Sequence, residues 1–498
     1  MYMVNTLSAK LDILSPQRVR ATTAIAIAMF LLFADLSIVC AQVATREPEV
    51  PTANEKVRAL ADALKDADAQ VRYAAAEGLV AIGPNAKAAV PALVEALKDS
   101  DAGIRGAAAT ALGAVGPDAK VAVPALVEAL KDPAASVRWS AAGALGAIGP
   151  DARAAVPVLV EILNDSTRHV RRAAAGALGG IGRPAVPALI EALKSSNAGV
   201  RLSAAGALGA VGPDAKAAVP ALAETLRDSA TGVRGAAAVA LGAIGPDAKT
   251  AVPALMEALK DSTASIRWST ASALGAIGPD AKAAVPALAG ALRDSNAGVR
   301  GAAAGALSAI GSDSVPALIA ALKNADAGVR WSAAGALGAI GPDATTAVPA
   351  LAIALQDANA GVRESAANAL GSIGADAIPA LVVALNSSHV TVRLSAASAL
   401  GAIGPEAVPA LAAALKNADA GVRRSATGAL GTIGPDAVLT LVEALKDSDA
   451  GVRGAAAIAL GAIGPDARAA MPALMEALED SDGYVRSAAA DALATIGR

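Results

Sequence analysis

From Arg72 to Arg486 the dipeptide Val-Arg or Ile-Arg recurs at spacings of 30 or 33 residues and no others. A fixed period of this length is typical of a repeat protein, in which one small structural unit is stacked many times. Fourteen such units follow one another and take up most of the 498 residues. Their arginines are Arg72, Arg105, Arg138, Arg171, Arg201, Arg234, Arg267, Arg300, Arg330, Arg363, Arg393, Arg423, Arg453 and Arg486.

Each unit contains two helical patterns separated by polar residues. Apolar residues at i, i+3, i+4 and i+7 form a stripe along a helix, and such a stripe is expected to face the core. In the first helix of the second unit the stripe consists of Val90, Leu93, Val94 and Leu97. In the second helix the apolar face consists of Ile104, Ala108, Leu112 and Val115. The pattern predicts one helical hairpin per unit.

The ends of both helices carry residues suited to those positions. Pro91 stands near the start of the first helix, where its missing N–H is not needed. Asp101 precedes the second helix and is expected to cap its free N–H groups. Gly116 follows that helix, and a glycine at this place in all fourteen units predicts a left-handed helix stop. Gly113, inside the helix, predicts a close approach of a neighbouring helix.

Composition and charge narrow the fold and the function classes. Aromatic residues make up only 2% of the chain and apolar residues 54%, so small side chains must be buried in thin layers that cover one another. The net charge of −3 becomes −4 without the leader described below, which argues against a nucleic-acid partner. The only cysteine, Cys40, lies in that leader, and we expect neither a metal nor a cofactor.

Residues 1–41 have the character of a signal peptide. An apolar run from Ala21 to Ala41 is preceded by basic residues and ends in residues that a signal peptidase accepts, so cleavage is expected after Ala41. The alternative is a membrane anchor formed by residues 21–41, because the run is close to the roughly 20 residues that a membrane span needs. The basic residues are Lys10, Arg18 and Arg20.

The leader predicts a periplasmic or secreted protein that has no membrane contact once the leader is removed. Residues 42–53, with two prolines, are expected to form a short linker. Residues 54–498 then contain the fourteen units. The last unit has little sign of a polar cap, so end-to-end self-association is possible.

Pro91, Asp99, Ile104 and Arg105, spaced eight, five and one residues apart, resemble the signature of the HEAT repeat. The stretch Val-Arg-x-x-Ala-Ala-x-Ala-Leu-Gly-x-Ile-Gly is similar, more narrowly, to the HEAT-like repeats of phycobilisome lyases. The resemblance covers residues 54–498 and implies an all-α, right-handed α-α superhelix of about 14 hairpins, a HEAT/armadillo-like solenoid.

The resemblance also implies a role for the recurring arginine and for the aspartate six residues before it. In HEAT proteins this pair forms a ladder of hydrogen bonds that links each unit to the next. Four units have another residue in place of the aspartate, and these side chains are expected to accept the hydrogen bond instead: Ser195, Asn324, Ser387 and Asn417.

The residue after each ladder arginine varies between glycine, charged and aromatic residues, and all three tryptophans occur there. A position with this variety cannot lie in a tightly packed core, so we expect it to be exposed along the concave face. The alternative is a packing role, in which the tryptophan rings lie over the seams between units. The candidate partner-binding residues are Tyr73, Trp139, Arg172, Leu202, Trp268, Trp331, Glu364, Leu394 and Arg424.

The sequence favours a non-enzymatic scaffold that binds a protein or peptide through these residues. The alternatives are a lyase like those of phycobilisomes, an oxidoreductase like deoxyhypusine hydroxylase, and a nucleic-acid-binding protein. This chain resembles deoxyhypusine hydroxylase in its repeats but lacks the His-Glu pairs that serve as iron ligands in that enzyme. Valine follows both His169 and His389. Both histidines are expected to lie in the turns between paired helices.

Overall fold

The computed structural model describes residues 52–497. The chain divides into two compact parts, which are residues 1–59, of which 52–59 are described, and residues 60–498. The predicted leader, and all of the predicted linker except residues 52 and 53, lie outside the described residues. The first helix begins at residue 53, one residue before the predicted start of the repeats.

Every unit is a helical hairpin, as predicted, and residues 52–497 contain no strand. The first helices are α2 (Ala53–Ala63), α4 (Val90–Ala96), α6 (Val123–Ala129), α8 (Val156–Ile162), α10 (Val186–Ala192), α12 (Val219–Thr225), α14 (Val252–Ala258), α16 (Val285–Ala291), α18 (Val315–Ala321), α20 (Val348–Ala354), α22 (Ile378–Leu385), α24 (Val408–Ala414), α26 (Val438–Ala444) and α28 (Met471–Ala477).

The second helices are twice as long as most of the first helices. They are α3 (Ala69–Ile82), α5 (Ala102–Val115), α7 (Ala135–Ile148), α9 (Arg168–Ile181), α11 (Ala198–Val211), α13 (Thr231–Ile244), α15 (Ala264–Ile277), α17 (Ala297–Ile310), α19 (Ala327–Ile340), α21 (Ala360–Ile373), α23 (Val390–Ile403), α25 (Ala420–Ile433), α27 (Ala450–Ile463) and α29 (Gly483–Ile496).

The stretch between units is a 3-10 helix at each of the thirteen junctions. Eleven of these connectors have a proline in the first turn, which fixes φ in the helical range, whereas Gly311–Ser314 and Ala375–Ala377 have none. The long connectors are η2 (Gly83–Ala89), η3 (Gly116–Ala122), η4 (Gly149–Ala155), η6 (Gly212–Ala218), η7 (Gly245–Ala251), η8 (Gly278–Ala284), η10 (Gly341–Ala347) and η14 (Gly464–Ala470). The short connectors are η5 (Arg183–Ala185), η9 (Gly311–Ser314), η11 (Ala375–Ala377), η12 (Pro405–Ala407) and η13 (Pro435–Ala437).

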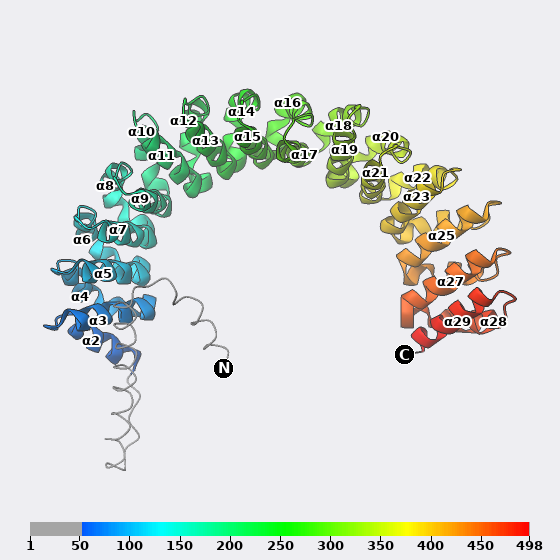
Figure 1. Ribbon diagram of the computed structural model, residues 1–498, viewed down its shortest axis with the longest axis horizontal. Helices are drawn as coiled ribbons and strands as arrows, with labels where there is room; N and C mark the ends of the chain where they lie inside the picture. Colours follow the sequence, from blue (N-terminus) through cyan, green and yellow to red (C-terminus); the bar gives the residue numbers. More distant parts are fainter. Residues whose placement is uncertain (1–51, 498) are drawn as a thin grey trace, which may run out of the picture. The chain divides into compact units, whose positions relative to one another are not determined.

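Within residues 60–497 the hairpins follow one another in a curved row, with the second helices along the inner side (Figure 1). Each second helix packs against the second helix of the next unit. This packing is less extensive at the five junctions that have a short connector. Connector length therefore changes how closely two neighbouring units fit together.

The core lies between the two helices of each unit and the helices of its neighbours. Leu93 and Leu112 are fully buried, as the apolar stripes predicted, and so are Ile104 and Ala108. Val94 was expected in the core but is only half-buried. The first helix is seven residues long, so fewer of its positions can face inward.

The predicted caps are present, with one difference. The Asp101 carboxylate accepts hydrogen bonds from the backbone N–H groups of Gly103 and Ile104, at 2.7 and 3.1 Å. Gly116 has φ 73° and ψ −141°, so the helix stops at a positive φ but not in the left-handed helical region. Thirteen glycines at this place have a positive φ, whereas the fourteenth, Gly497, has φ −78°. No connector follows Gly497 among the described residues.

The glycines inside the second helices fall into two kinds. At Gly146 a Cβ atom would stand 2.9 Å from the Cα atom of Ala177 in the next unit, so the close approach predicted from the sequence is confirmed. At Gly143, one turn earlier on the same helix, a Cβ atom would meet no heavy atom within 4 Å. Only Gly146 is needed for packing.

Two apolar stretches, Ala297–Ala321 and Ala327–Ala354, are long and apolar enough to cross a membrane by composition alone. A bent helix pair, Arg168–Ile181 with Arg183–Ala192, passes the same test as one broken span. Each consists of a second helix, a connector and the following first helix of the repeat array. In each of the two long stretches, 39% of the apolar window is buried inside the protein.

Substitution of Gly146 and Gly143 by alanine should have opposite effects on stability. Gly146→Ala should lower the free energy of unfolding by about 1–3 kcal/mol, because the new methyl group overpacks the contact with Ala177. Gly143→Ala should raise it by about 0.5–1 kcal/mol, because alanine favours a helix interior. Urea unfolding followed by circular dichroism at 222 nm measures both, and equal shifts of the midpoints would contradict the packing described.

Candidate partner-binding face and ladder

The ladder arginine links each unit to the next through a bidentate contact. Arg105 Nε donates to Asp132 Oδ2 at 2.7 Å, and Arg105 Nη2 donates to Asp132 Oδ1 at 2.9 Å. Its Nη1 donates to the backbone carbonyls of Asp99 and Ser100 in its own unit, at 2.8 and 3.0 Å. Because Asp132 belongs to the next unit, one guanidinium joins two hairpins, as the resemblance implied.

Nine such pairs, which we call rungs, occur in residues 52–497 and are largely buried. They confirm the predicted ladder at these junctions. The rungs are Arg72–Asp99, Arg105–Asp132, Arg138–Asp165, Arg201–Asp228, Arg234–Asp261, Arg267–Asp294, Arg330–Asp357, Arg423–Asp447 and Arg453–Asp480.

The prediction for the four junctions without aspartate was wrong. Each substitute side chain accepts a hydrogen bond from the backbone N–H two residues later, and none accepts from the ladder arginine within residues 52–497. An aspartate oxygen can accept the same backbone bond while the other oxygen binds arginine. Serine and asparagine lack the second carboxylate oxygen that accepts from the arginine Nε in the rungs, and the one oxygen that each has accepts the backbone bond. The residues are Ser195, Asn324, Ser387 and Asn417.

These four junctions are also four of the five that have a short connector. The fifth keeps its rung, because Arg423 Nε donates to Asp447 Oδ2 at 2.6 Å across the short connector η13. A short connector is therefore compatible with a rung. The side chain at the aspartate position decides whether a rung forms.

The rungs also shift the ionisation of their carboxylates. The Arg105 guanidinium, by hydrogen bonding, holds the pKa of Asp132 below its ordinary value, while burial opposes this. A carboxylate whose pKa is lowered by folding stabilises the fold above its ordinary pKa of about 4, and this stabilisation is lost as the pH falls through the lowered value.

Along the exposed side of the second helices, the structure places all nine candidate partner-binding residues at the surface. The tryptophans are about half exposed, at 52% for Trp139, 49% for Trp268 and 55% for Trp331. The register is not exposed throughout, since Gly106 and Gly454 are buried at the same position. The nine are Tyr73, Trp139, Arg172, Leu202, Trp268, Trp331, Glu364, Leu394 and Arg424.

We call this surface the second-helix face; it comprises the residue after each ladder arginine and the residue four positions later. At the second of these two positions, seven residues that vary between units are exposed as well. They are Glu77, Thr110, Gly143, Val239, Asn368, Ile458 and Asp491.

The large side chains of this face also touch the seams between units. Trp268 Cδ1 lies 3.6 Å from the point where a Cβ atom of Gly298 would stand, and Trp331 Cδ1 lies 3.5 Å from the corresponding point of Gly361. Glycine on the next unit thus makes room for the ring. At the last junction the order is reversed, because the Tyr484 ring occupies the space over Gly454. Exposure and seam packing coexist in these rings.

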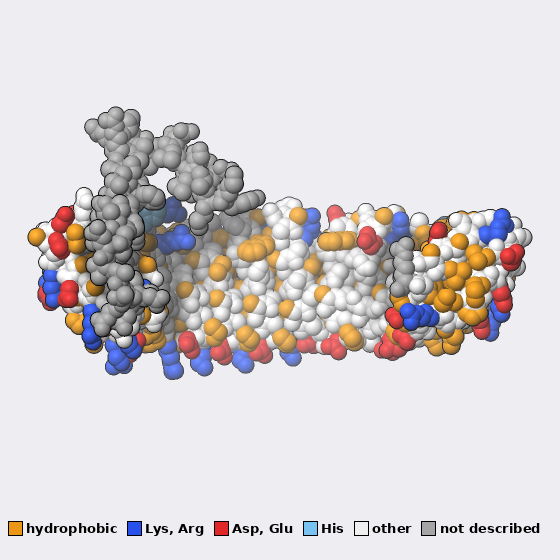
Figure 2. Space-filling model, turned by 90° about the horizontal axis from the view of Figure 1, so that it is seen from below, with side chains coloured by type: hydrophobic (Ala, Val, Ile, Leu, Met, Phe, Trp, Pro, Cys, Tyr) orange, Lys and Arg blue, Asp and Glu red, His pale blue; other side chains and the backbone are white. Residues whose placement is uncertain are grey.

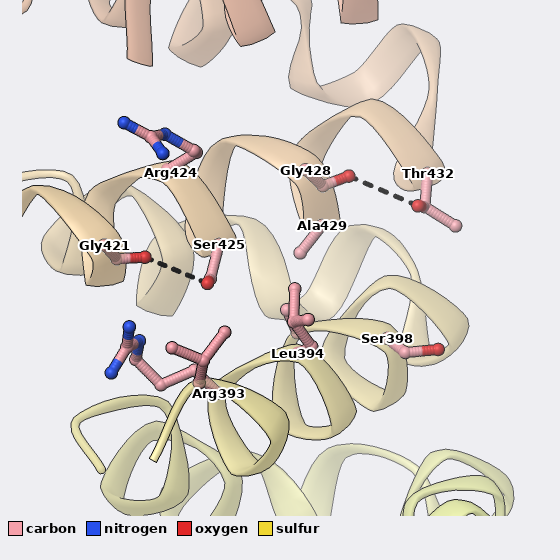
Figure 3. Close-up of a pocket in the computed structure, with 11 residues that line it drawn as sticks. Arg393, Leu394, Ser398, Gly421, Arg424, Ser425, Gly428, Ala429 and Thr432 are labelled. Carbon is pink, nitrogen blue, oxygen red and sulfur yellow. Dashed lines mark hydrogen bonds between the residues drawn. The ribbon is translucent and has the colours of Figure 1, made fainter. Parts of the chain in front are cut away.

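Two of the predicted residues, Leu394 and Arg424, share a cleft of about 390 Å³ between α23 and α25. Figure 3 shows the Arg393 guanidinium between α23 and α25 near Gly421, whereas the Arg424 guanidinium points away from Arg393, toward Gly451 and Asp449 of the next unit. The Leu394 side chain lies in the middle. The remaining predicted residues are distributed one to a unit along the row.

The sequence reasoning missed Arg393 as a member of this cleft. Arg393 was assigned to the ladder, but Asn417 leaves it without a rung, and its buried Nε has no hydrogen-bond partner among the described residues. Asparagine at the aspartate position was the signal that could have identified it.

The two histidines are exposed, but only one lies where it was expected. His389 precedes α23, whereas His169 lies inside the first turn of α9. Within residues 52–497 no three His, Cys, Asp or Glu side chains are grouped so that they could hold a metal ion.

The family model for HEAT repeats matches almost the entire described part of the chain. The matched segments are 57–146, 118–176, 156–242, 186–275, 219–308, 285–371, 348–431 and 408–494. The chain belongs to the HEAT-repeat family. The all-α solenoid implied by the resemblance is therefore confirmed as a fold.

Solved structures with a similar arrangement include large HEAT proteins. Kap95p, in a study of its binding to RanGDP, is 14% identical over 88% of this chain and 71% of its own, with a TM-score of 0.48. Importin beta is 17% identical over 89% of this chain and 76% of its own, with a TM-score of 0.48. Kap121p is 14% identical over 91% of this chain and 62% of its own, with a TM-score of 0.49. No curated protein sequence matches this chain.

Loss of one rung should weaken one junction measurably. Asp132→Asn removes the carboxylate that binds Arg105 and should lower the free energy of unfolding by about 1–3 kcal/mol at pH 7. The difference from the unmodified protein should shrink as the pH falls through the lowered pKa of Asp132, because the carboxyl is then protonated in the folded chain as well as in the unfolded chain. Urea midpoints measured from pH 7 down into the acid range test this.

Asp151→Asn is the matched control for this prediction. Asp151 pairs with Lys120 at 4.0 Å on the surface, with both side chains more than half exposed. Exposed pairs of this kind contribute about 0–1 kcal/mol. Equal losses for the two variants at pH 7 would show that the rungs do not hold the units together.

Proposed function

We propose that this HEAT solenoid is a scaffold that binds a protein or peptide along the second-helix face. The observation that carries the proposal is the row of large, half-exposed side chains at one register of units that are otherwise almost alike. Tryptophan, tyrosine and arginine are the residues that most often supply binding energy in protein interfaces. Their repetition from unit to unit suits an extended partner.

The electrostatic character of the face supports a protein partner. Seen from the inner side of the row, uncharged and apolar atoms make up most of the visible surface, and charged side chains gather mainly along its edges (Figure 2). Nine of the arginines are bound to carboxylates in rungs. Together with a net charge of −3, this favours a peptide over a nucleic acid, which needs a basic groove.

The finer resemblance to phycobilisome-lyase repeats concerns the helical module itself. The residues that carry it here are used for the core, the helix stops and the ladder. We therefore propose a binding function without catalysis. The leader in residues 1–41 supports export to the periplasm or medium, and end-to-end association of two chains is a further possibility.

Removal of the three tryptophans should abolish partner capture. The variant with Trp139, Trp268 and Trp331 all changed to alanine should bind its partner at least tenfold more weakly, because aromatic anchors dominate interface energies. Affinity capture from the exported fraction, followed by titration of the captured partner, measures this. The mass of the protein purified from that fraction shows whether its chain starts at residue 42.

Two further variants separate recognition from packing. Leucine occupies the same position at Leu202 and Leu394, so changing the three tryptophans to leucine should preserve stability but not partner binding. The triple variant Ile353→Ala, Val383→Ala, Leu439→Ala removes exposed apolar side chains from the first helices and should bind as the unmodified protein does. Full binding by the tryptophan-to-alanine variant would contradict the proposal.

A further inference from the structure

Among the four ladder arginines that face a junction without a rung, Arg393 has a buried Nε without a partner among the described residues. Arg393 donates through Nη1 to the carbonyls of Ser387 and Ser388, at 2.8 and 3.1 Å. The residue is only 8% exposed. A buried donor of this kind is costly unless an acceptor reaches the same group.

Asn417, and not the geometry of the junction, is the reason for this gap. The next junction also has a short connector, and there the same separation of 24 residues brings Arg423 and Asp447 together at 2.6 Å. The amide of Asn417 is used otherwise, since Nδ2 donates to Asn386 Oδ1 at 2.6 Å and Oδ1 accepts from the backbone N–H of Asp419. An acceptor for Arg393 must therefore come from outside the ladder.

The cleft between α23 and α25 opens beside this arginine. Arg393 and Arg424 both line it, and no Asp or Glu is among the lining residues. The Arg393 guanidinium lies near Gly421, whereas the Arg424 guanidinium is turned toward Asp449 of the next unit (Figure 3). Nη2 of Arg393 lies 2.8 Å from the point where a Cβ atom of Gly421 would stand, so glycine leaves that edge of the guanidinium uncovered by a side chain.

The rest of the cleft suits a peptide. Leu394 and Val390 each expose 57% of their surface and provide apolar lining in the same cleft as Arg393 and Arg424. Arg424 is already paired with Asp449, at 3.0 Å, but this pair is exposed. Surface pairs of this kind contribute little, so Arg424 can turn to a second carboxylate at small cost.

We propose that the α23–α25 cleft binds a carboxylate of an extended peptide, with Arg393 and Arg424 as donors and Leu394 and Val390 beneath the neighbouring apolar side chain. The position that Asp fills elsewhere in the ladder favours a carboxylate over a phosphate, because arginine matches it with two parallel N–H···O bonds. The inference rests on the proposed function and specifies the chemistry of the segment bound at this junction.

Fluorescence polarisation with the full chain and labelled octapeptides tests the inference. The probes contain alanine and leucine around one central aspartate, asparagine or phosphoserine, all with an amidated C-terminus. A fourth has only alanine and leucine and a free C-terminal carboxylate. We expect the aspartate peptide to bind at least tenfold more tightly than the asparagine peptide, and less tightly at 300 mM than at 50 mM salt. The fourth peptide shows whether a C-terminal carboxylate serves as well.

Variants locate the binding at the cleft. Asn417→Asp should form a tenth rung, raise the urea midpoint and weaken binding of the aspartate peptide at least tenfold. Arg424→Gln should also weaken binding of this peptide. Arg153→Gln, which removes an exposed arginine from connector η4, should leave the binding unchanged. Retention of tight aspartate-peptide binding by Asn417→Asp would overturn the inference, as would stronger binding of the phosphoserine peptide.

These outcomes are separate from those of the tryptophan variants. If the aspartate peptide does not bind while partner capture still depends on the tryptophans, only the carboxylate site is wrong. If the peptide binds as described but the tryptophan-to-alanine variant captures its partner normally, the proposed tryptophan-based function is wrong and the carboxylate site remains.

Discussion

The close packing of each second helix on the next is the contact on which the whole molecule depends. Where Gly146 faces Ala177, two helices approach until no further methyl group fits between them. At this distance thin hairpins without large side chains still cover one another's apolar faces. The rungs reinforce the contact, since each guanidinium holds carbonyl groups of one unit and a carboxylate of the next.

Helix packing and the rungs together explain which positions vary in sequence between units. Residues that face the next helix must stay small, and residues that form rungs must keep both members of the pair. Most positions of the second-helix face have neither constraint, so glycine, glutamate, arginine and tryptophan can occupy one register, although Gly454 lies under the Tyr484 ring. Where a rung itself is lost, as at Asn417, the arginine is left without its carboxylate beside an open cleft. We propose that neighbouring residues of the same repeat carry recognition and stability.

The hairpins, their caps and their core could be predicted from sequence because each depends on residues close together in the chain. The positions of Pro91 at a helix start, Asp101 at a helix cap and Ile104 in the core follow from helix geometry alone. The ladder came from the resemblance to HEAT repeats, because a pair 27 residues apart cannot be read from local pattern. The 3-10 form of the connectors and the ψ angle of Gly116 were not predicted from the sequence, although a proline in the first turn of most connectors favours a helical φ.

The candidate site was predicted in part for the same reason. Exposure of the Trp268 register followed from its variability, but the fit of its ring over Gly298 needs the neighbouring unit. The cleft arises from two units and one missing carboxylate. Asn417 was expected to replace aspartate, and the competition of a backbone N–H for its single oxygen is visible only in the folded chain.

Hydrogen exchange measured by mass spectrometry on the full chain tests most directly whether stacking locked by rungs holds the array together. Local openings exchange first where neighbouring units are coupled least. The account predicts the fastest exchange at the junctions α9–α11, α17–α19, α21–α23 and α23–α25, which lack rungs. It predicts slower exchange at α25–α27, which has a short connector and a rung. Uniform exchange, or equally fast exchange at α25–α27, would contradict the role given to the ladder.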